Sequence, residues 1–246
     1  MIKAKIDTRD RLIVALDTSS LDEARTMVED LKEVVSFFKV GLELYCHAGT
    51  RLFDFIEETG IQVFFDGKFH DIPNTVAGAA RNVTRRQVRM FNVHATGGRK
   101  MMEAAGRASA EAAEEIGKPR PILIAVTVLT SLSEAELAGE LSVSVPMTEH
   151  VIDLARLAKS AGLDGVVASA KEARPIREAL GEDFVIVTPG IRPAWSAKDD
   201  QSRIVTPSQA LDDGADYLVV GRPITRAGDR KDAARRILEE MDQALS

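Results

Sequence analysis

The chain has 246 residues, 45% of them hydrophobic and 28% charged, which is ordinary for a globular protein and enough for one large domain. Its formal net charge of −6 argues against a general affinity for nucleic acid or for an anionic membrane. Cys46 is the only cysteine, so no disulfide can form within the chain. No run approaches the ~18 apolar residues of a membrane span, and the N-terminus has no apolar signal region. We therefore expect a cytoplasmic protein with no nucleic-acid or membrane partner.

Eight short apolar runs have the length and composition of buried strands. They lie at residues 11–17, 36–41, 62–68, 89–95, 121–129, 164–169, 184–190 and 216–222. Amphipathic segments with helical periodicity lie at 20–34, 50–60, 74–86, 97–117, 147–163 and 171–181, with a weaker one at 207–215 and a last one at 229–246. Strands that alternate with helices imply parallel pairing through right-handed crossovers.

Eight strands in a chain of this length predict the α/β class, with residues 1–246 forming a (β/α)8 TIM barrel as a single domain. The alternative is a doubly wound sheet. That fold would be expected to carry a G-x-G-x-x-G fingerprint after the first strand, and the sequence has none there.

Ionisable side chains occur where the first four predicted strands end. Asp17 ends the first strand, Lys39 lies near the end of the second, Asp66 and Lys68 end the third, and His94 lies near the end of the fourth. Strand alternation places Asp17 and Lys39 on the face opposite their apolar neighbours, so these groups would converge at the mouth of a barrel. A structural ion-pair network is the alternative, although polar groups at this end of a barrel more often serve catalysis.

The segment "FFDGKFHDIPNT" at 64–75 alternates acids and a lysine. Asp66 and Lys68 are two residues apart, Asp71 follows, and Pro73 suits the first turn of a helix. Acids beside a lysine keep its ammonium protonated, and such a cation can stabilise a developing carbanion and then protonate it. Two cations make the cluster a poor metal site, and a protonated lysine cannot attack a carbonyl.

Two long connections, from Thr130 to about Pro146 and from Arg192 to Pro207, follow the fifth and seventh strands. Both are lid candidates, because barrel active sites are built at this end of the strands. Gly221 and Arg222 follow the eighth strand, where a close backbone approach and a guanidinium would suit a phosphate; a surface turn is the alternative.

Other polar residues allow two interpretations from the sequence alone. Arg192 and Gln201 could be solvated loop residues. Thr130 and Ser131 could contact a polar ring or cap a short helix that begins near Ser133. We expect His70 to be a structural histidine rather than a catalytic one. The sequence does not decide the role of His94.

Five segments, in this order and spacing, closely resemble the orotidine 5′-phosphate decarboxylase family. They are "DGKFHDIPNT" (66–75), "VTVLTS" (126–131), "TPGIRP" (188–193), "DDQSRIVTP" (199–207) and "VVGRPIT" (219–225). The resemblance spans nearly the whole chain. It implies a (β/α)8 barrel, a homodimer with active sites at the subunit interface, and decarboxylation of orotidine 5′-monophosphate to uridine 5′-monophosphate and CO2. In the family this is the last step of pyrimidine synthesis and uses no cofactor or metal.

The resemblance also implies roles for individual residues. Lys39, Asp66, Lys68 and Asp71 match the family's Lys-Asp-Lys-Asp tetrad, in which the second aspartate reaches across the dimer. Lys68 would protonate C6 after CO2 leaves, and the two aspartates would orient it.

The substrate contacts implied by the resemblance involve several strand ends and loops. Asp17 and Lys39 match ribose contacts, Thr75 a position near the partner's ribose, Thr130 a pyrimidine contact, and Arg192, Gln201, Gly221 and Arg222 the phosphate-binding set.

One departure from the family pattern is Gly67, where the family usually has a larger apolar residue. Position 67 would point away from the barrel mouth, so we expect an effect on helix packing or stability rather than on chemistry.

Two rival functions remain. Related sugar-phosphate enzymes, 3-keto-gulonate-phosphate decarboxylase and hexulose-phosphate synthase, share Asp-x-Lys-x-x-Asp but bind magnesium partly through an acid near the end of the second strand, where this chain has Lys39. A non-catalytic nucleotide-binding barrel would predict a broken tetrad, and all four residues are present.

Overall fold

Eight parallel strands form a closed barrel, in chain order, in the computed structural model of the protein, which describes residues 6–196 and 205–245. The strands are β1 (Leu12–Ala15), β2 (Phe37–Gly41), β3 (Gln62–Phe69), β4 (Met90–His94), β5 (Ile122–Val126), β6 (Gly165–Val167), β7 (Val185–Pro189) and β8 (Tyr217–Val220). β1 pairs with β8 as well as with β2, and this closes the barrel. The predicted barrel is confirmed, and the doubly wound alternative is wrong because that sheet would be open.

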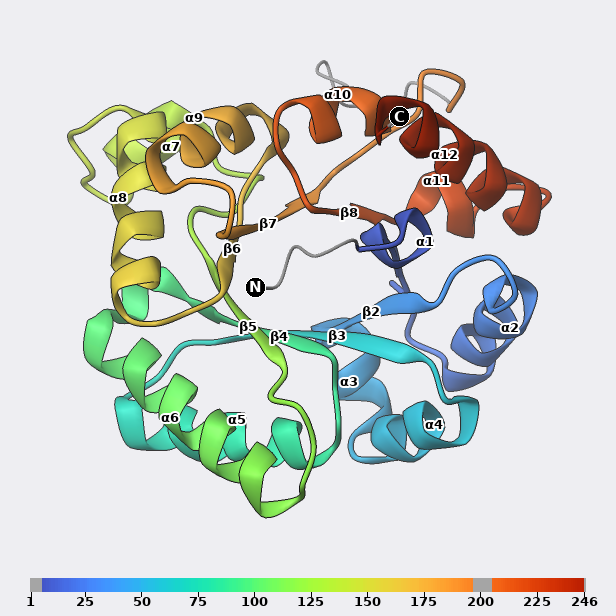
Figure 1. Ribbon diagram of the computed structural model, residues 1–246, viewed down its shortest axis with the longest axis horizontal. Coiled ribbons are helices and arrows are strands. Elements are labelled where there is room, and N and C mark those ends of the chain that lie inside the picture. The colour runs from blue at the N-terminus through green and yellow to red at the C-terminus, as the bar shows by residue number, and fades with distance from the viewer. Residues whose placement is uncertain (1–5, 197–204, 246) are drawn as a thin grey trace.

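Helices surround the barrel on the outside (Figure 1). They are α1 (Thr8–Arg11), α2 (Leu21–Leu31), α3 (Leu42–Ala48), α4 (Arg51–Thr59), α5 (Pro73–Arg85), α6 (Arg99–Glu115), α7 (Glu134–Gly139), α8 (Met147–Ser160), α9 (Ala170–Leu180), α10 (Pro207–Asp212), α11 (Arg222–Thr225) and α12 (Arg230–Leu245), with a 3-10 turn, η1 (Ala95–Gly97). Each amphipathic segment expected from the sequence overlaps one of these helices, with α5 and α9 beginning one residue earlier than expected. Among the described residues, no helix is both long and apolar enough to cross a bilayer.

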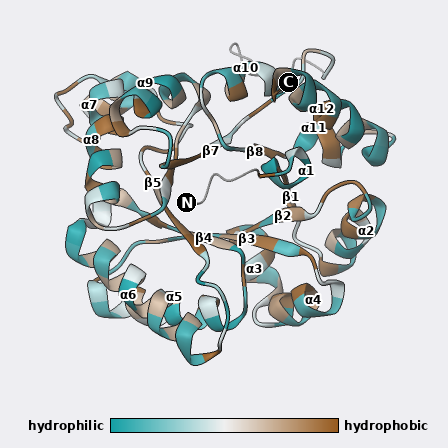
Figure 2. Ribbon diagram, in the orientation of Figure 1, coloured by the Kyte–Doolittle hydropathy of each residue, from teal (hydrophilic) through white to brown (hydrophobic). Residues whose placement is uncertain are grey.

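The strands are buried on both faces, which explains their apolar composition. Side chains such as Ile13, Phe37 and Tyr217 fill the inside of the barrel. Val14 and Phe38, each next to an inward residue in sequence, belong to the larger core between strands and helices. The strands are accordingly the most hydrophobic ribbons in Figure 2, whereas the helices combine hydrophobic and hydrophilic residues. The strand alternation assumed from the sequence is thus confirmed for β1 and β2.

β3 departs from regular geometry at its end. Phe65 pairs with Phe91 and Phe69 pairs with Val93, so four steps along β3 match only two steps along β4. Within this bulge, Lys68 has a φ of +48°. This left-handed conformation costs a non-glycine residue on the order of 1–3 kcal/mol, and such residues cluster at functional sites. The irregularity therefore marks the end of β3 as a place to look for function.

Candidate active site at the carboxyl ends of the strands

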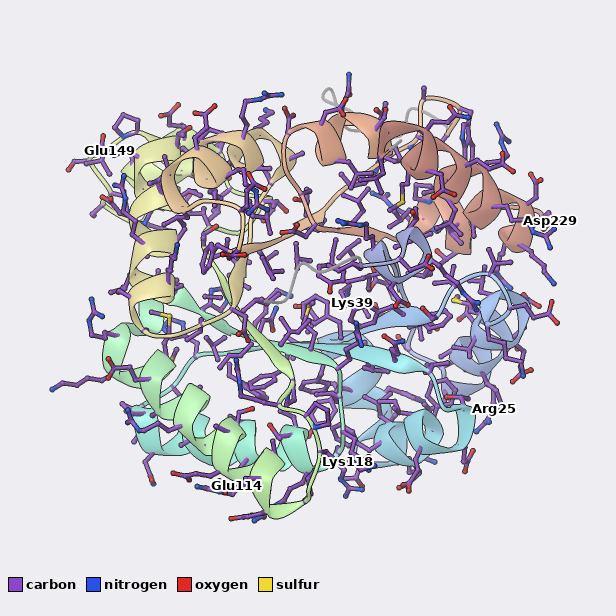
Figure 3. The ribbon with its side chains drawn as sticks, in the orientation of Figure 1. Arg25, Lys39, Glu114, Lys118, Glu149 and Asp229 are labelled. Carbon is purple, nitrogen blue, oxygen red and sulfur yellow. The ribbon has the colours of Figure 1, made fainter. Side chains whose placement is uncertain are left out.

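Four charged side chains form a continuous chain of alternating sign across the ends of β1, β2 and β3. Nζ of Lys39 lies 3.1 Å from Oδ1 of Asp17 and 3.4 Å from Oδ2 of Asp66. Nζ of Lys68 lies 2.7 Å from Oδ1 of Asp66. Figure 3 shows Lys39 near the middle of the ring of strands, whereas the other labelled residues, such as Lys118, lie around the rim. The predicted convergence of Asp17, Lys39, Asp66 and Lys68 is confirmed.

Asp66 is the central member of this charge chain and is 8% exposed. Burial alone would raise the pKa of its carboxyl group. The ammonium groups of Lys39 and Lys68, together with hydrogen bonds from Lys68 and Asn92, outweigh burial and hold the pKa of Asp66 below its usual value. Asp66 is therefore a carboxylate at neutral pH and is the counter-ion of both lysines.

Asn92 of β4 is part of the site, although we did not single it out from the sequence. It is 1% exposed. Its Nδ2 donates to Oδ1 of Asp66, and its Oδ1 accepts from the backbone N–H of Lys68, both at 2.7 Å. The sequence contains an indication of this role, because strand alternation places the polar side chain of Asn92 on the same face of β4 as Met90 and His94.

The two histidines lie beside the charge chain. The rings of His70 and His94 are 5.4 Å apart between centroids. Burial, followed by electrostatic interaction with the neighbouring His70 and Lys68, lowers the pKa of His94. His94 is therefore neutral at physiological pH and can accept or donate one hydrogen bond at each ring nitrogen. His70 is exposed.

Asp71 lies apart from the four charges within this chain. Its side chain is exposed, and Oδ1 accepts a hydrogen bond from the backbone N–H of Ile72 at 2.6 Å. Among the described residues it forms no ion pair. Thr75 is also exposed and lies in the first turn of α5, behind Pro73 at the start of the helix, as the sequence predicted. Ile72 between them is 66% exposed, which is unusual for an isoleucine.

The predicted phosphate-binding residues come from β8 and the loop after β7. Gly221 precedes α11, and a Cβ atom placed on it would lie 3.6 Å from Oδ2 of Asp17, so the end of β8 closely approaches the charge chain. Arg222 is exposed at the first position of α11, and Arg192 is 7% exposed with its backbone N–H donating to the carbonyl of Val205. Gln201 lies outside the described residues.

A cavity of about 820 Å³ opens at the ends of β5, β6 and β7. Thr130, Ser169, Pro189 and Gly190 are among the residues that line it. Thr130 is thus well placed to contact a ligand. The alternative prediction, that Thr130 or Ser131 caps the following helix, is wrong. Ser133 caps α7, in a reciprocal arrangement with Glu136, because that pair satisfies two backbone N–H groups at once.

Gly67 points away from the mouth of the barrel, as predicted. A Cβ atom on it would lie 2.6 Å from a ring carbon of Phe65 and 3.0 Å from one of Phe69. The ring of Phe65 packs in turn against Tyr45 and Phe53, at centroid distances of 5.3 and 5.8 Å. Aromatic rings from β3, α3 and α4 therefore occupy the space that a larger residue at position 67 would need.

No group of three or more His, Cys, Asp or Glu side chains with the proximity of a metal site occurs in the described ranges, 6–196 and 205–245. The charge chain contains only two carboxylates, each paired with an ammonium group. Such an arrangement can stabilise a developing charge electrostatically and can transfer a proton.

Comparison with known proteins gives one consistent result. The model of the orotidine 5′-phosphate decarboxylase / HUMPS family matches residues 10–237. The chain is similar to proteins named orotidine 5′-phosphate decarboxylase from Heliobacterium modesticaldum, with 51% identity over 98% of this chain and 99% of that protein, and from Moorella thermoacetica, with 50% identity over 97% and 94%.

Solved structures agree. The chain is similar to the crystal structure of orotidine 5′-phosphate decarboxylase from Lactobacillus acidophilus, with a TM-score of 0.83 and 38% identity over 95% of this chain and 99% of that one. It is also similar to that of the Pyrococcus horikoshii enzyme, with a TM-score of 0.73 and 26% identity over 94% and 99%. The family match over residues 10–237 includes all eight strands and the site residues described above.

Proposed function

Since this chain belongs to the orotidine 5′-phosphate decarboxylase / HUMPS family and is a decarboxylase of pyrimidine biosynthesis, we propose that it converts orotidine 5′-monophosphate to uridine 5′-monophosphate with Lys68 as the proton donor. The observation that carries the proposal is the alternating charge chain from Asp17 through Lys39 and Asp66 to Lys68.

The reaction breaks the bond between C6 of the pyrimidine and its carboxylate carbon. CO2 leaves, and the electron pair of that bond stays on C6. The ammonium of Lys68 stabilises this charge and passes a proton to C6, and the resulting neutral amine takes a proton back from water. Asp66, 2.7 Å from Nζ of Lys68, is the counter-ion that holds the ammonium in place.

The substrate would lie across the mouth of the barrel. Asp17 and Lys39 are assigned to the ribose hydroxyls, and Thr130 to the pyrimidine ring. Arg192, Gln201, Gly221 and Arg222 are assigned to the phosphate as a set. The close approach of Gly221 to Asp17 supports this arrangement, because it brings the phosphate and ribose positions side by side.

A second copy of the chain would complete the site. Asp71 and Thr75 are exposed and flank the exposed apolar side chain of Ile72. This combination suits a surface covered by another subunit. We assign Asp71 to the active site of the partner in a homodimer, and Thr75 to a position near the partner's ribose.

Lys39 favours this function over the magnesium-dependent members of the family. Its ammonium lies between Asp17 and Asp66, where a divalent cation would meet a positive charge. The residues present do not fit a magnesium site at this position, and we assign no cofactor to the reaction.

The test follows the loss of orotidine 5′-monophosphate absorbance, with and without EDTA, for the native chain, Lys68→Ala and Lys118→Ala. Lys118 is an exposed lysine on the rim and is the matched control (Figure 3). We expect EDTA-resistant turnover in the native chain and in the control, and a collapse in Lys68→Ala. Turnover that EDTA abolishes, or no turnover at all, would overturn the proposal in favour of the sugar-phosphate enzymes.

A further inference from the structure

A buried amide joins the two strands at the point where their ladder is interrupted. The pairing of β3 with β4 slips between Phe65 and Phe69, so the backbone of Lys68 is out of register with β4. A buried backbone N–H without an acceptor is strongly unfavourable. The side chain of Asn92 supplies the acceptor, at 2.7 Å from the N–H of Lys68.

The same amide also fixes the carboxylate of Asp66. Nδ2 of Asn92 donates to Oδ1 of Asp66 at 2.7 Å, and Nζ of Lys68 donates to the same oxygen at 2.7 Å. The orientation of the amide is determined by its partners, because the N–H of Lys68 requires the oxygen and the carboxylate requires the nitrogen. One side chain therefore holds the backbone of Lys68 and the counter-ion of its ammonium together.

We propose that Asn92 is a positioning residue for the decarboxylation, which holds the left-handed backbone of Lys68 and the carboxylate of Asp66 so that the ammonium of Lys68 is aimed at the reacting carbon. The inference rests on the proposed role of Lys68. Asn92 is 1% exposed and is assigned no contact with the substrate. Its effect is transmitted through two hydrogen bonds to the residue that moves the proton.

Neither alanine nor an ionised aspartate can replace both of these bonds. Alanine would leave the N–H of Lys68 without its acceptor and Asp66 without one donor. Aspartate keeps the size and the acceptor, but its second oxygen would face Oδ1 of Asp66, and two carboxylates this close repel unless one holds a proton. A protonated carboxyl at this position could donate to Asp66 as the amide does. The activity of Asn92→Asp, relative to that of the native chain, should therefore increase as the pH falls.

The test measures kcat and KM of the native chain, Asn92→Ala, Asn92→Asp and the control Ser109→Ala between pH 5 and 8. Ser109 is fully buried and shares a hydrogen bond of 2.9 Å with Thr84, between α5 and α6, so its loss reports the effect of removing a buried bond elsewhere. We expect Asn92→Ala to lose about 10²-fold in kcat, because the donor is misplaced, while KM changes less than about threefold.

For Asn92→Asp, we expect the activity relative to the native chain to rise as the pH falls. Asp66, Lys39, Lys68 and His94 also face this region, so each activity is compared with that of the native chain at the same pH. This variant keeps the side-chain volume, so it serves as the test if Asn92→Ala does not fold. A kcat within twofold of native for both variants, or a pH-independent ratio for Asn92→Asp, would overturn the inference. A native chain without decarboxylase activity would instead count against the proposed function.

Discussion

Nζ of Lys68 lies 2.7 Å from Oδ1 of Asp66, although the two residues are separated by a full pleat of β3. On a regular strand, residues two apart share a face but start about 6.5 Å from each other. The bulge in β3 and the left-handed backbone of Lys68 accompany the close approach. The local departure from strand geometry is thus part of how the charge chain is assembled.

The first prediction is that Asp66→Asn lowers kcat/KM by about 10²-fold or more. The substitution leaves the ammonium groups of Lys39 and Lys68 next to each other without their shared carboxylate, so the repulsion between them is no longer offset. Steady-state kinetics of orotidine 5′-monophosphate turnover would measure the loss.

Asp164→Asn is the matched control for that substitution. Asp164 also pairs with a cation, at 2.6 Å from Arg120, but it immediately precedes β6, at the end of the barrel opposite the site. We expect this variant to lose stability while its kcat stays close to native. Equal losses of activity in both variants would mean that Asp66 acts only through the fold.

The second prediction concerns the pH dependence of stability. The pKa of Asp66 is lower in the folded protein than its usual value of 3.8, so the carboxylate stabilises the folded state above that pH. As the pH falls through 3.8, the carboxyl group binds a proton in the unfolded chain but not yet in the folded one. The stabilising contribution therefore decreases progressively and is gone once the pH is below the folded-state pKa. Urea unfolding of the native chain and Asp66→Asn between pH 6 and 3 would measure it. We expect a shallower decline in the variant, and parallel curves would contradict the assignment.

The third prediction is that Gly67→Ala destabilises the protein by about 1–3 kcal/mol through overpacking. The new Cβ would meet the ring of Phe65 at 2.6 Å, and that ring is held by its aromatic neighbours. Gly106→Ala in α6 is the control, because nothing lies within 4 Å of its Cβ position and alanine is the better helix former.

Thermal and urea unfolding of the two glycine variants would measure the difference. Turnover of Gly67→Ala below its melting temperature should remain within a few-fold of native, because position 67 points toward α3 and α4. A stable Gly67→Ala protein with little activity would show that this position acts on chemistry instead.

Strand periodicity was sufficient to predict which residues reach the mouth of the barrel. Asp17 and Lys39 could be assigned because β1 and β2 alternate regularly, with Ile13 inside and Val14 outside. Periodicity also places Asn92 on the face of β4 that Met90 and His94 share, but it does not predict the two hydrogen bonds of Asn92. Its role depends on a slip in the pairing of β3 with β4, and such a slip is a property of two strands together rather than of either sequence.

Two further features were not predictable from strand periodicity: the residue that caps α7, and the role of Asp71, which we expect to depend on a second subunit. Ser131 and Ser133 are both plausible caps, because each has a glutamate three residues ahead, Glu134 and Glu136 respectively. In the structure Ser133 and Glu136 form the reciprocal pair, whereas Glu134 accepts from the backbone N–H of Met147. For Asp71, strand periodicity does not predict which side chains it contacts, because the residue lies after the end of β3 on an exposed turn. Its role across a dimer stays a prediction, and it can be tested in solution.

The fourth prediction is that two inactive variants restore activity when mixed. If Asp71 serves the partner's site, a heterodimer of Lys68→Ala and Asp71→Asn has one site with both native residues and one with neither. Random exchange at equal concentrations makes half of the dimers mixed, so activity should recover to about one quarter of native. Refolding or subunit exchange followed by the absorbance assay would measure it. A mixture as inactive as its components would assign Asp71 to its own chain's site or to none.

The fifth prediction is that the phosphate contributes to turnover as well as to affinity. Binding energy from a remote group can drive loop closure and hold the reacting part of the substrate in place. Orotidine, which lacks the phosphate, should therefore show a lower kcat than the nucleotide. If only KM rises, the phosphate provides uniform binding and no catalysis.

Arg222→Ala shows whether that effect passes through the predicted phosphate contact. Arg222 is exposed at the start of α11, beside the close approach of Gly221 to Asp17. Its removal should lower kcat/KM for the nucleotide by about 10- to 100-fold, as expected for a charge-assisted contact, and leave orotidine turnover unchanged. Arg226→Ala, an exposed arginine four residues further along, should affect neither substrate. An equal loss with both substrates in Arg222→Ala would show that this arginine supports the fold of the β8 end rather than the phosphate.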